Sequence, residues 1–228
     1  MEIIDNAVAR GQRALSEFEA KQLLAEYAIP VPREKRVHTA DEARKAAREI
    51  GFPVVIKGTG PELMHKTEAG AVILHIYEAD VAAAAFDQLS GRLGDQMDGA
   101  IVSEMVAGQR EIVIGLHREP QFGPCVMLGV GGVMAEVLND TAFRVAPFDD
   151  REARQMPTEL RARKIFEPFR GEAAVDMDAL CRSLTALGKI GTDHAHIGEI
   201  DINPMMITPQ GWLVAVDALV VVNGGGHE

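Results

Sequence analysis

The chain has 228 residues and a formal net charge of −11, with 34 Asp and Glu against 23 Lys and Arg. Its content of 47% hydrophobic and 25% charged residues is ordinary for a globular protein and excludes an intrinsically disordered chain. The acidic balance argues against a general nucleic-acid binder, which needs a basic surface, but it leaves small anionic ligands open because a few local cations can bind a phosphate.

The cysteines and the apolar runs predict a cytoplasmic protein. Cys125 and Cys181 lie in apolar or helical stretches, and we expect both to be reduced thiols. The first residues show no basic stretch followed by an apolar core, so no signal peptide is expected. The longest apolar runs, such as Leu213–Val222, fall short of the ~20 residues that span a bilayer.

Capping boxes and breaker residues delimit the elements of the first half. Ser16 with Glu19, and Thr39 with Glu42, place a hydroxyl three residues before a glutamate, which satisfies free amides at a helix start. The predicted elements are a helix from residue 16, an extended segment to 37, a helix over 40–50, strands over 53–57, 71–76 and 100–106, and a helix over 80–93. Residues 1–13 are predicted to be an N-terminal extension and 14–106 a first subdomain of α/β character.

Strand patterns crowd together in the second half. Turn residues separate apolar runs at 111–116, 125–130, 133–138 and 143–146, a density that predicts mainly antiparallel pairing. Asp176 or Asp178 begins a helix, and two last strands are expected at 197–202 and 212–216. The basic segment 157–172 is predicted to be surface loop and 223–228 a flexible tail. Residues 107–222 therefore form a second subdomain, and the fold class is α+β.

The first candidate functional cluster follows the strand that ends at Lys57. The loop over 58–70 contains His65, Lys66 and Thr67, a nucleophile, a cation and a hydroxyl, between glycines that allow close backbone approach. No G-x-x-x-x-G-K-[ST] sequence occurs, so this is not a Walker-type phosphate loop. A lysine that merely extends to solvent is the alternative for Lys57.

The second cluster lies across a turn between two strands. Glu104 and Glu111 are seven residues apart, with Met105 and Val106 after the first. Such an edge can offer backbone groups and apolar side chains to a nucleotide base, and a carboxylate to ribose hydroxyls. A hairpin with two solvated glutamates remains the alternative.

The third cluster alternates acidic and apolar residues. Glu199, Asp201 and Asn203 lie on one side of the predicted strand, and Asp217 on a neighbouring strand can complete the set. Oxygen ligands of this kind suit Mg²⁺, which usually takes one or two protein groups plus phosphate oxygens. The alternative is an exposed polar strand face.

Two other features of the second half are less specific. The glycines of 129–132 are predicted to mark a hairpin. They are not a dinucleotide-binding fingerprint, because the G-x-G-x-x-G spacing is missing. Arg144 stands alone in an apolar run, where it can reach a phosphate or serve as a surface arginine.

Taken together, six motifs resemble one family. In order they are 53–57, His65-Lys-Thr-Glu-Ala-Gly70, Glu104-Met-Val106, Pro120-Gln-Phe-Gly-Pro124, Phe143-Arg-Val-Ala-Pro147, and Asp201-Ile-Asn-Pro204 with Asp217. This order and spacing resembles the β subunit, or ATP-grasp domain, of NDP-forming acyl-CoA synthetases of the ADP-forming acetyl-CoA synthetase type. The resemblance covers about residues 14–222.

The resemblance implies an ATP-grasp fold, in which two α+β subdomains grip the nucleotide between antiparallel sheets. It implies that Lys57 contacts nucleotide phosphates, that Glu104, Met105 and Val106 form the adenine hinge, and that Glu111 holds the ribose. It also implies that Asn203 and Asp217 are Mg²⁺ ligands with Asp201 close by, that His65 is transiently phosphorylated, and that Lys66 and Arg144 help to neutralise charge. A neutral imidazole is a good nucleophile near pH 7, and phosphoryl transfer needs mainly positioning and neutralised charge.

The implied reaction is acyl-CoA + ADP + phosphate ⇌ carboxylic acid + CoA + ATP. Because no CoA-binding fingerprint is apparent, a separate α subunit is expected to bind CoA and to carry most of the acyl specificity. Three positions depart from the family pattern, namely Glu68, Ala71 and Leu219, and none of them is assigned to phosphoryl transfer. The alternatives are a stand-alone ATP-grasp carboxylate ligase and a non-catalytic nucleotide-binding regulatory subunit.

Overall fold

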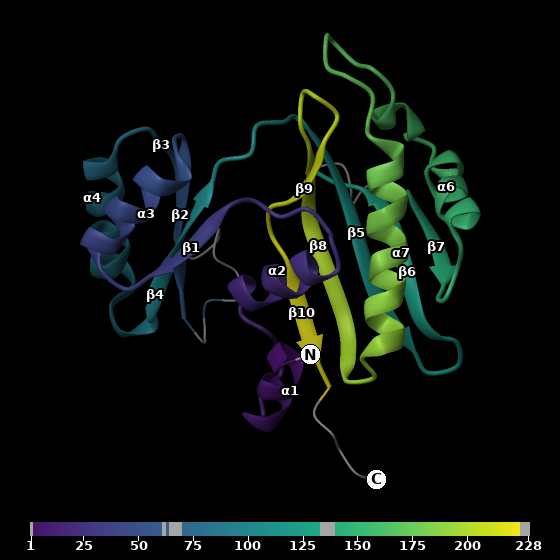
Figure 1. Cartoon of the computed structure of the whole chain (residues 1–228), viewed down its shortest axis with the longest axis horizontal. Coiled ribbons are helices and arrows are strands. Elements are labelled where there is room, and N and C mark those ends of the chain that lie inside the picture. The colour runs from purple at the N-terminus through teal and green to yellow at the C-terminus, as the bar shows by residue number, and fades with distance from the viewer. Residues whose placement is uncertain (1, 61–62, 64–69, 133–139, 224–228) are drawn as a thin grey trace. The chain divides into compact units, whose positions relative to one another are not determined.

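The computed structural model describes residues 2–60, 63, 70–132 and 140–223, and it divides the chain into two compact units (Figure 1). The larger unit combines residues 1–31 with 106–228, and the smaller unit is residues 32–105. The smaller unit ends at residue 105, close to the predicted subdomain boundary at 106. It begins at residue 32, whereas the predicted first subdomain begins at residue 14, because residues 14–31 belong to the larger unit.

The smaller unit is a four-stranded sheet with two helices packed on it. The strands, in sheet order, are β1 (Glu34–Val37), β4 (Gly99–Glu104), β2 (Val54–Thr59) and β3 (Val72–Ile76). The helices α3 (Ala40–Ile50) and α4 (Ala79–Leu93) lie on the sheet, and the short helix η1 (Gly94–Gln96) follows α4 (Figure 1). The alternation of helix and strand does not give a parallel sheet here, because β4 inserts between β1 and β2 and every pair is antiparallel.

The larger unit is built on a second antiparallel sheet. Its strands run in the order β10 (Leu219–Val222), β8 (Ile197–Ile207), β5 (Arg110–Glu119), β6 (Gly123–Val130) and β7 (Thr141–Val145), and β9 (Leu213–Ala215) pairs with β8. The helices are α1 (Glu2–Ala9), α2 (Glu17–Glu26), α6 (Asp150–Glu159) and α7 (Met177–Asp193). Alternate residues Ile112, Ile114 and Leu116 of β5 pack in the core, which leaves the other face of the strand for polar residues.

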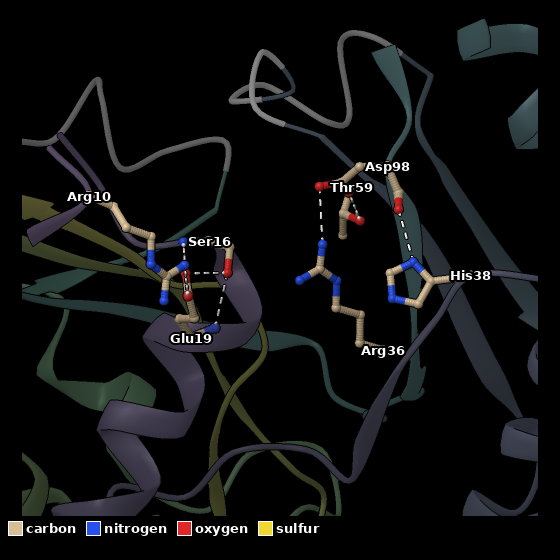
Figure 2. Close-up of polar contacts among 7 residues, drawn as sticks. All are labelled: Arg10, Ser16, Glu19, Arg36, His38, Thr59 and Asp98. Carbon is tan, nitrogen blue, oxygen red and sulfur yellow. Dashed lines mark hydrogen bonds and ion pairs between the residues drawn. The ribbon is translucent and has the colours of Figure 1, made fainter. Parts of the chain in front are cut away.

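Hydrogen bonds within the larger unit explain why the N-terminal residues belong to it. The predicted capping box at Ser16 is confirmed, because the Glu19 amide donates to Ser16 Oγ and the Glu19 carboxylate accepts from the Ser16 amide (Figure 2). Leu15 donates to the carbonyl of Val220 on β10 at 2.9 Å. At the other end of α2, Tyr27 Oη donates to Asp193 Oδ2 at 2.9 Å, and burial together with this bond raises the pKa of Tyr27 to about 12.

Two other segments differ from the prediction. The predicted extension over 1–13 contains α1, whose Ile4 and Ala7 are buried in the core. The predicted surface loop over 157–172 contains the end of α6 and the short helix η2 (Arg163–Phe166), and its Leu160 and Phe166 are buried. The prediction relied on the basic residues of this segment, whereas Leu160 and Phe166 are buried only because other elements of the tertiary fold pack against them. The predicted strand over 133–138 and the tail after residue 223 lie outside the described residues.

A buried ion pair lies on α2. The Nζ atom of Lys21 is 2.8 Å from Glu17 Oε1, and the two side chains are only 1% and 3% exposed. Two charges removed from water are stable only when they remain together, because an isolated buried charge is costly.

Replacing Lys21 with alanine is therefore expected to lower the free energy of unfolding by about 3 kcal/mol or more, because the substitution removes the ammonium group from a buried carboxylate. Urea denaturation measures the loss. Lys45→Ala is the matched control, since Lys45 lies 4.0 Å from Glu49 with the same four-residue separation but is 80% exposed. Equal losses in the two variants would contradict the expectation.

Candidate active site

The acidic residues of β8 share one face of the larger sheet. Glu199, Asp201 and Asn203 alternate with Ile200 and Ile202, which are buried at 1% and 0% exposure. The predicted alternation is therefore confirmed. Because β8 is a strand with neighbours on both sides, this face presents the polar residues over a continuous sheet.

Asp217 lies close to this face but not on a strand. It stands in the connection between β9 and β10, and its Oδ1 accepts a hydrogen bond from the Ala218 amide at 2.9 Å. The prediction that it sits on a neighbouring strand is therefore wrong. Position 219, two residues later, pairs with Asp201 in the sheet register.

Electrostatics connect these acids. Burial raises the pKa of Asp201, and the negative charges of Glu199 and Asp217 raise it further. Carboxylates that repel one another in a partly buried place are stabilised by a cation, so the residues present fit Mg²⁺. Among the described residues no three His, Cys, Asp or Glu side chains form a metal site on their own. Asn203 and Asp217 offer one amide and one carboxylate, a set of the size that Mg²⁺ can take together with phosphate oxygens.

A pocket of about 320 Å³ adjoins Asp201 on the same face. In the sheet register Asp201 pairs with Gly115, Gly115 with Met127, and Met127 with Phe143. A row across four strands thus runs from an acid, over a glycine, to an apolar and aromatic wall. The pocket is lined by Gly115, Leu116, His117, Glu119, Cys125, Met127, Phe143, Glu199, Ile200 and Asp201. Sequence reasoning missed most of these residues, although the alternation along β5 and β6 carried a signal for them.

Glu111 lies near the start of β5 against the glycine turn. The Gly131 amide donates to the Glu111 carbonyl at 2.9 Å. A Cβ atom on Gly131 would lie 3.0 Å from both the carbonyl carbon and Cβ of Glu111, and one on Gly132 would lie 3.6 Å from its Oε2. The predicted hairpin glycines therefore let the turn pack closely on a residue that was predicted to hold ribose.

Arg144 is placed away from the acids. Its neighbour Phe143 lies on the face of Met127 and Asp201, so Arg144 lies on the opposite face, level with buried Val126. Its guanidinium donates to both carboxylate oxygens of Glu159 on α6. The predicted contact of Arg144 with a nucleotide phosphate stays a prediction, and in this structure the side chain is turned toward α6, where it is bonded to Glu159.

The remaining predicted residues are divided between the units. In the smaller unit, half-buried Lys57 lies on β2, and Glu104 ends β4. The hydrogen bond from Arg33 Nε, 3.0 Å from Glu104 Oε2, lowers the pKa of Glu104. Met105 follows and donates its amide to the Pro53 carbonyl. Val106 begins the second part of the larger unit, while His65 and Lys66 lie outside the described residues.

Comparison with known proteins identifies the family to which this chain belongs. A family described as an ATP-grasp domain matches residues 6–222. The chain is 36% identical, over 98% of both chains, to the β subunit of acetate–CoA ligase [ADP-forming] II of Pyrococcus furiosus. It is 39% identical to acetate–CoA ligase [ADP-forming] I of Archaeoglobus fulgidus, with 93% of this chain covering 32% of that longer protein.

Solved structures agree with the sequence relatives. Acetyl-coenzyme A synthetase 1 of Ca. Korarchaeum cryptofilum, in complex with coenzyme A, Ca-AMPCP and HgCl⁺, matches with a TM-score of 0.92 and 35% identity over 97% of this chain and 98% of that chain. A second complex of that enzyme holds coenzyme A and Mg-AMPPCP, with its phosphohistidine segment pointing towards the nucleotide binding site, and matches with a TM-score of 0.86, 36% identity and the same coverage. The fold is thus the expected ATP-grasp fold with two antiparallel sheets, and the chain belongs to the ATP-grasp domain family, in the group that contains the β subunits of ADP-forming acetate–CoA ligases.

Proposed function

We propose that this chain is the ATP-grasp component of an ADP-forming acyl-CoA synthetase, an acid–thiol ligase. The observation that carries the proposal is the match over nearly the full length of a separate β subunit, at 36% identity. The acidic face formed by β8, with a pocket beside it, supplies the local chemistry that such a match requires.

In this proposal His65 carries the phosphoryl group. A neutral ring nitrogen of His65 attacks the γ-phosphorus of ATP, the bond from phosphorus to the bridging oxygen breaks, and ADP leaves. Transfer of the same group to a carboxylate gives an acyl phosphate and restores the imidazole. Lys57 and Lys66 offset negative charge, Glu104 to Val106 hold the adenine, and Glu111 binds the ribose.

Asn203 and Asp217 would hold Mg²⁺, with Asp201 beside them. Burial and the nearby charges of Glu199 and Asp217 raise the pKa of Asp201, and this gathering of carboxylates supports the assignment. When bound, Mg²⁺ would neutralise phosphate charge in the transfer.

The proposed partner is a separate CoA-binding α subunit, and the proposed compartment is the cytoplasm. Relatives that are longer than this chain, such as the Archaeoglobus protein of which it covers 32%, are consistent with a partner that is fused in some members and separate in others. None of the helices that the structure describes is long and apolar enough to cross a membrane.

Labelling tests the proposal. The purified chain is incubated with Mg²⁺ and γ-labelled ATP, alone and with its α subunit, and the complete system is assayed for ATP formed from acyl-CoA, ADP and phosphate. Acid-labile, base-stable label on this chain, with ATP formation that needs both subunits, is the expected result. Ligation by the chain alone without label would favour the stand-alone ligase. Nucleotide binding with neither label nor turnover would favour the regulatory subunit.

Asp217→Asn is expected to weaken binding of the magnesium–nucleotide complex about tenfold, because it removes one anionic oxygen from the proposed metal site. Calorimetric titration of ADP at several Mg²⁺ concentrations measures the change. Asp178→Asn, on the exposed start of α7, is the matched control and should bind like the wild type. Unchanged affinity in the Asp217 variant would remove that residue from the metal site.

A further inference from the structure

The basic segment between α6 and α7 contains a tight hairpin. The amides of Phe169 and Glu172 each donate to the carbonyl of the other residue, at 3.2 and 2.9 Å, so Arg170 and Gly171 form a two-residue turn. Their φ angles are 49° and 87°, the pair of positive values that a type I′ turn requires. In Figure 1 the segment that leads from α6 to α7 is the green loop at the top of the larger unit.

Arginine is an unusual residue at the first position of such a turn. Asparagine and glycine adopt positive φ angles readily, whereas a longer side chain is disfavoured there because its Cβ atom crowds the backbone. Strained backbone conformations of this kind cluster at binding and catalytic positions. The conformation of Arg170 therefore indicates that its side chain serves a purpose that the turn alone does not explain.

The stem of the hairpin is held by Arg110. Its guanidinium donates to Glu172 Oε2 at 2.9 Å and to the carbonyls of Glu167 and Ala173 at 3.1 and 2.6 Å, and the side chain is only 5% exposed. Residues on both sides of the turn are thus bonded to one buried group. Because the stem is fixed, little conformational freedom remains to be lost when the tip binds a partner.

The tip and its surroundings expose aromatic rings as well as a cation. The Cζ atom of Arg170 lies 5.1 Å from the centroid of the Phe169 ring, which is itself 51% exposed. Trp212, the only tryptophan of the chain, is 64% exposed. Its turn is joined to the chain just after the hairpin, because the Ala173 amide donates to the Pro209 carbonyl at 2.9 Å. Arginine and tryptophan are the residues that most often dominate protein–protein interfaces.

The local charge is opposite to that of the whole chain. Arg163 and Lys164 of η2 are exposed, and among the described residues no carboxylate forms an ion pair with either of them or with Arg170. Glu167 lies between them in the sequence and offsets one of the three charges. Salt screens charges that are farther away than a Debye length of ~8–10 Å. An approaching surface therefore meets these cations more than it meets the net charge of −11.

We propose that Phe169, Arg170 and Trp212, with the cations Arg163 and Lys164 of the preceding helix, form a docking surface for an acidic patch of the CoA-binding α subunit. The inference rests on the proposed function, which requires such a partner. The planar guanidinium of Arg170 would pair with a carboxylate of the α subunit through two parallel hydrogen bonds.

The composition of this surface favours a protein over other anionic ligands. A small anion needs cations alone, whereas exposed aromatic rings gain by burial against another apolar surface. A nucleic acid would have to approach a chain of net charge −11, which carries only a few local cations here. An acidic protein patch with apolar residues beside it fits both the charge and the rings.

The test compares variants of Arg170 in the full chain. Arg170→Asn removes the guanidinium but places in the turn a residue that adopts a positive φ readily, so it should fold at least as well as the wild type. Arg170→Lys keeps the charge and loses the planar fork. Arg48→Ala is the matched control, since Arg48 is an exposed arginine in the last turn of α3 in the smaller unit. Calorimetric titration with the purified α subunit at ~50 and ~200 mM NaCl measures the affinity. Thermal unfolding, ADP binding and sedimentation are measured on the chain alone.

Arg170→Asn is expected to bind the α subunit at least about tenfold more weakly and with a smaller dependence on salt. Its unfolding temperature should be equal to that of the wild type or higher, and its nucleotide Kd should be unchanged. Arg170→Lys should bind with an affinity between those two proteins. Arg48→Ala should bind like the wild type.

Wild-type affinity of Arg170→Asn for the α subunit would overturn the inference and leave the proposed function intact. A changed nucleotide Kd in the chain alone would also overturn it, by assigning Arg170 to the nucleotide site. Self-association of the wild-type chain that Arg170→Asn abolishes would assign the surface to a second copy instead. A wild-type chain that neither binds an α subunit nor takes acid-labile label in its presence would overturn the proposed function, and the inference with it.

Discussion

Replacing His65 with alanine is expected to abolish the acid-labile label from γ-labelled ATP and, with it, the synthesis of ATP from acyl-CoA, ADP and phosphate. The reason is chemical. Alanine has no nucleophile, and a hydroxyl such as that of Thr67 would give a phosphate ester, which is stable in acid instead of acid-labile. Autoradiography after acid and base treatment, together with a coupled assay for ATP, measures the two effects. Nucleotide affinity should change little, because the proposed adenine, ribose and metal residues remain.

His196→Ala is the matched control for this variant. His196 is an exposed histidine of the larger unit, and its backbone carbonyl accepts a hydrogen bond from the Asn223 amide, which the substitution leaves in place. It should keep both label and turnover. Full labelling of the His65 variant would mean that another residue carries the phosphoryl group, and the relay through His65 would be wrong.

Arg110→Met is expected to cost about 4 kcal/mol of the free energy of unfolding. The guanidinium is 5% exposed and donates to Glu172 and to the backbone carbonyls of Ile165, Glu167 and Ala173. Methionine fills most of the volume but donates nothing, so a carboxylate and three carbonyls lose a buried donor. Chemical denaturation measures the loss. Because Arg110 precedes Glu111, nucleotide affinity is expected to fall in the same variant.

Arg154→Met provides the comparison at the surface. Arg154 also contacts two carboxylates, Asp150 at 2.7 Å and Asp178 at 2.6 Å, but it is 46% exposed. Water replaces those contacts when the arginine is removed, so only a small change in the free energy of unfolding is expected. If the two variants lost equal stability, burial would not be the reason that Arg110 matters.

Local patterns predicted local structure well. The capping box at Ser16 needs only four consecutive residues, and the alternation along β8 needs only the pleat of a strand, so both could be read from the chain. The antiparallel character of the second half followed from closely spaced turns. In each case the information lies within about ten residues.

Features that depend on distant partners were harder to predict. The residues around Arg144 do not indicate its partner, because Glu159, which accepts its hydrogen bonds, lies fifteen residues away on another element. The placement of 14–31 depends on β10, and the burial of Phe166 on a core assembled from many elements. The approach of Asp217 to Asp201 is likewise a property of the β9–β10 connection, because its sequence neighbours do not specify it.

The discontinuous larger unit has a consequence for synthesis on the ribosome. Leu15 and Val220, which share a backbone hydrogen bond, are 205 residues apart (220 − 15), so the first helices emerge long before the strand that they need. Residues 32–105 are contiguous and are complete at an early stage. We therefore expect the smaller unit to fold during translation, while the N-terminal helices keep apolar surface exposed until the last strand is released.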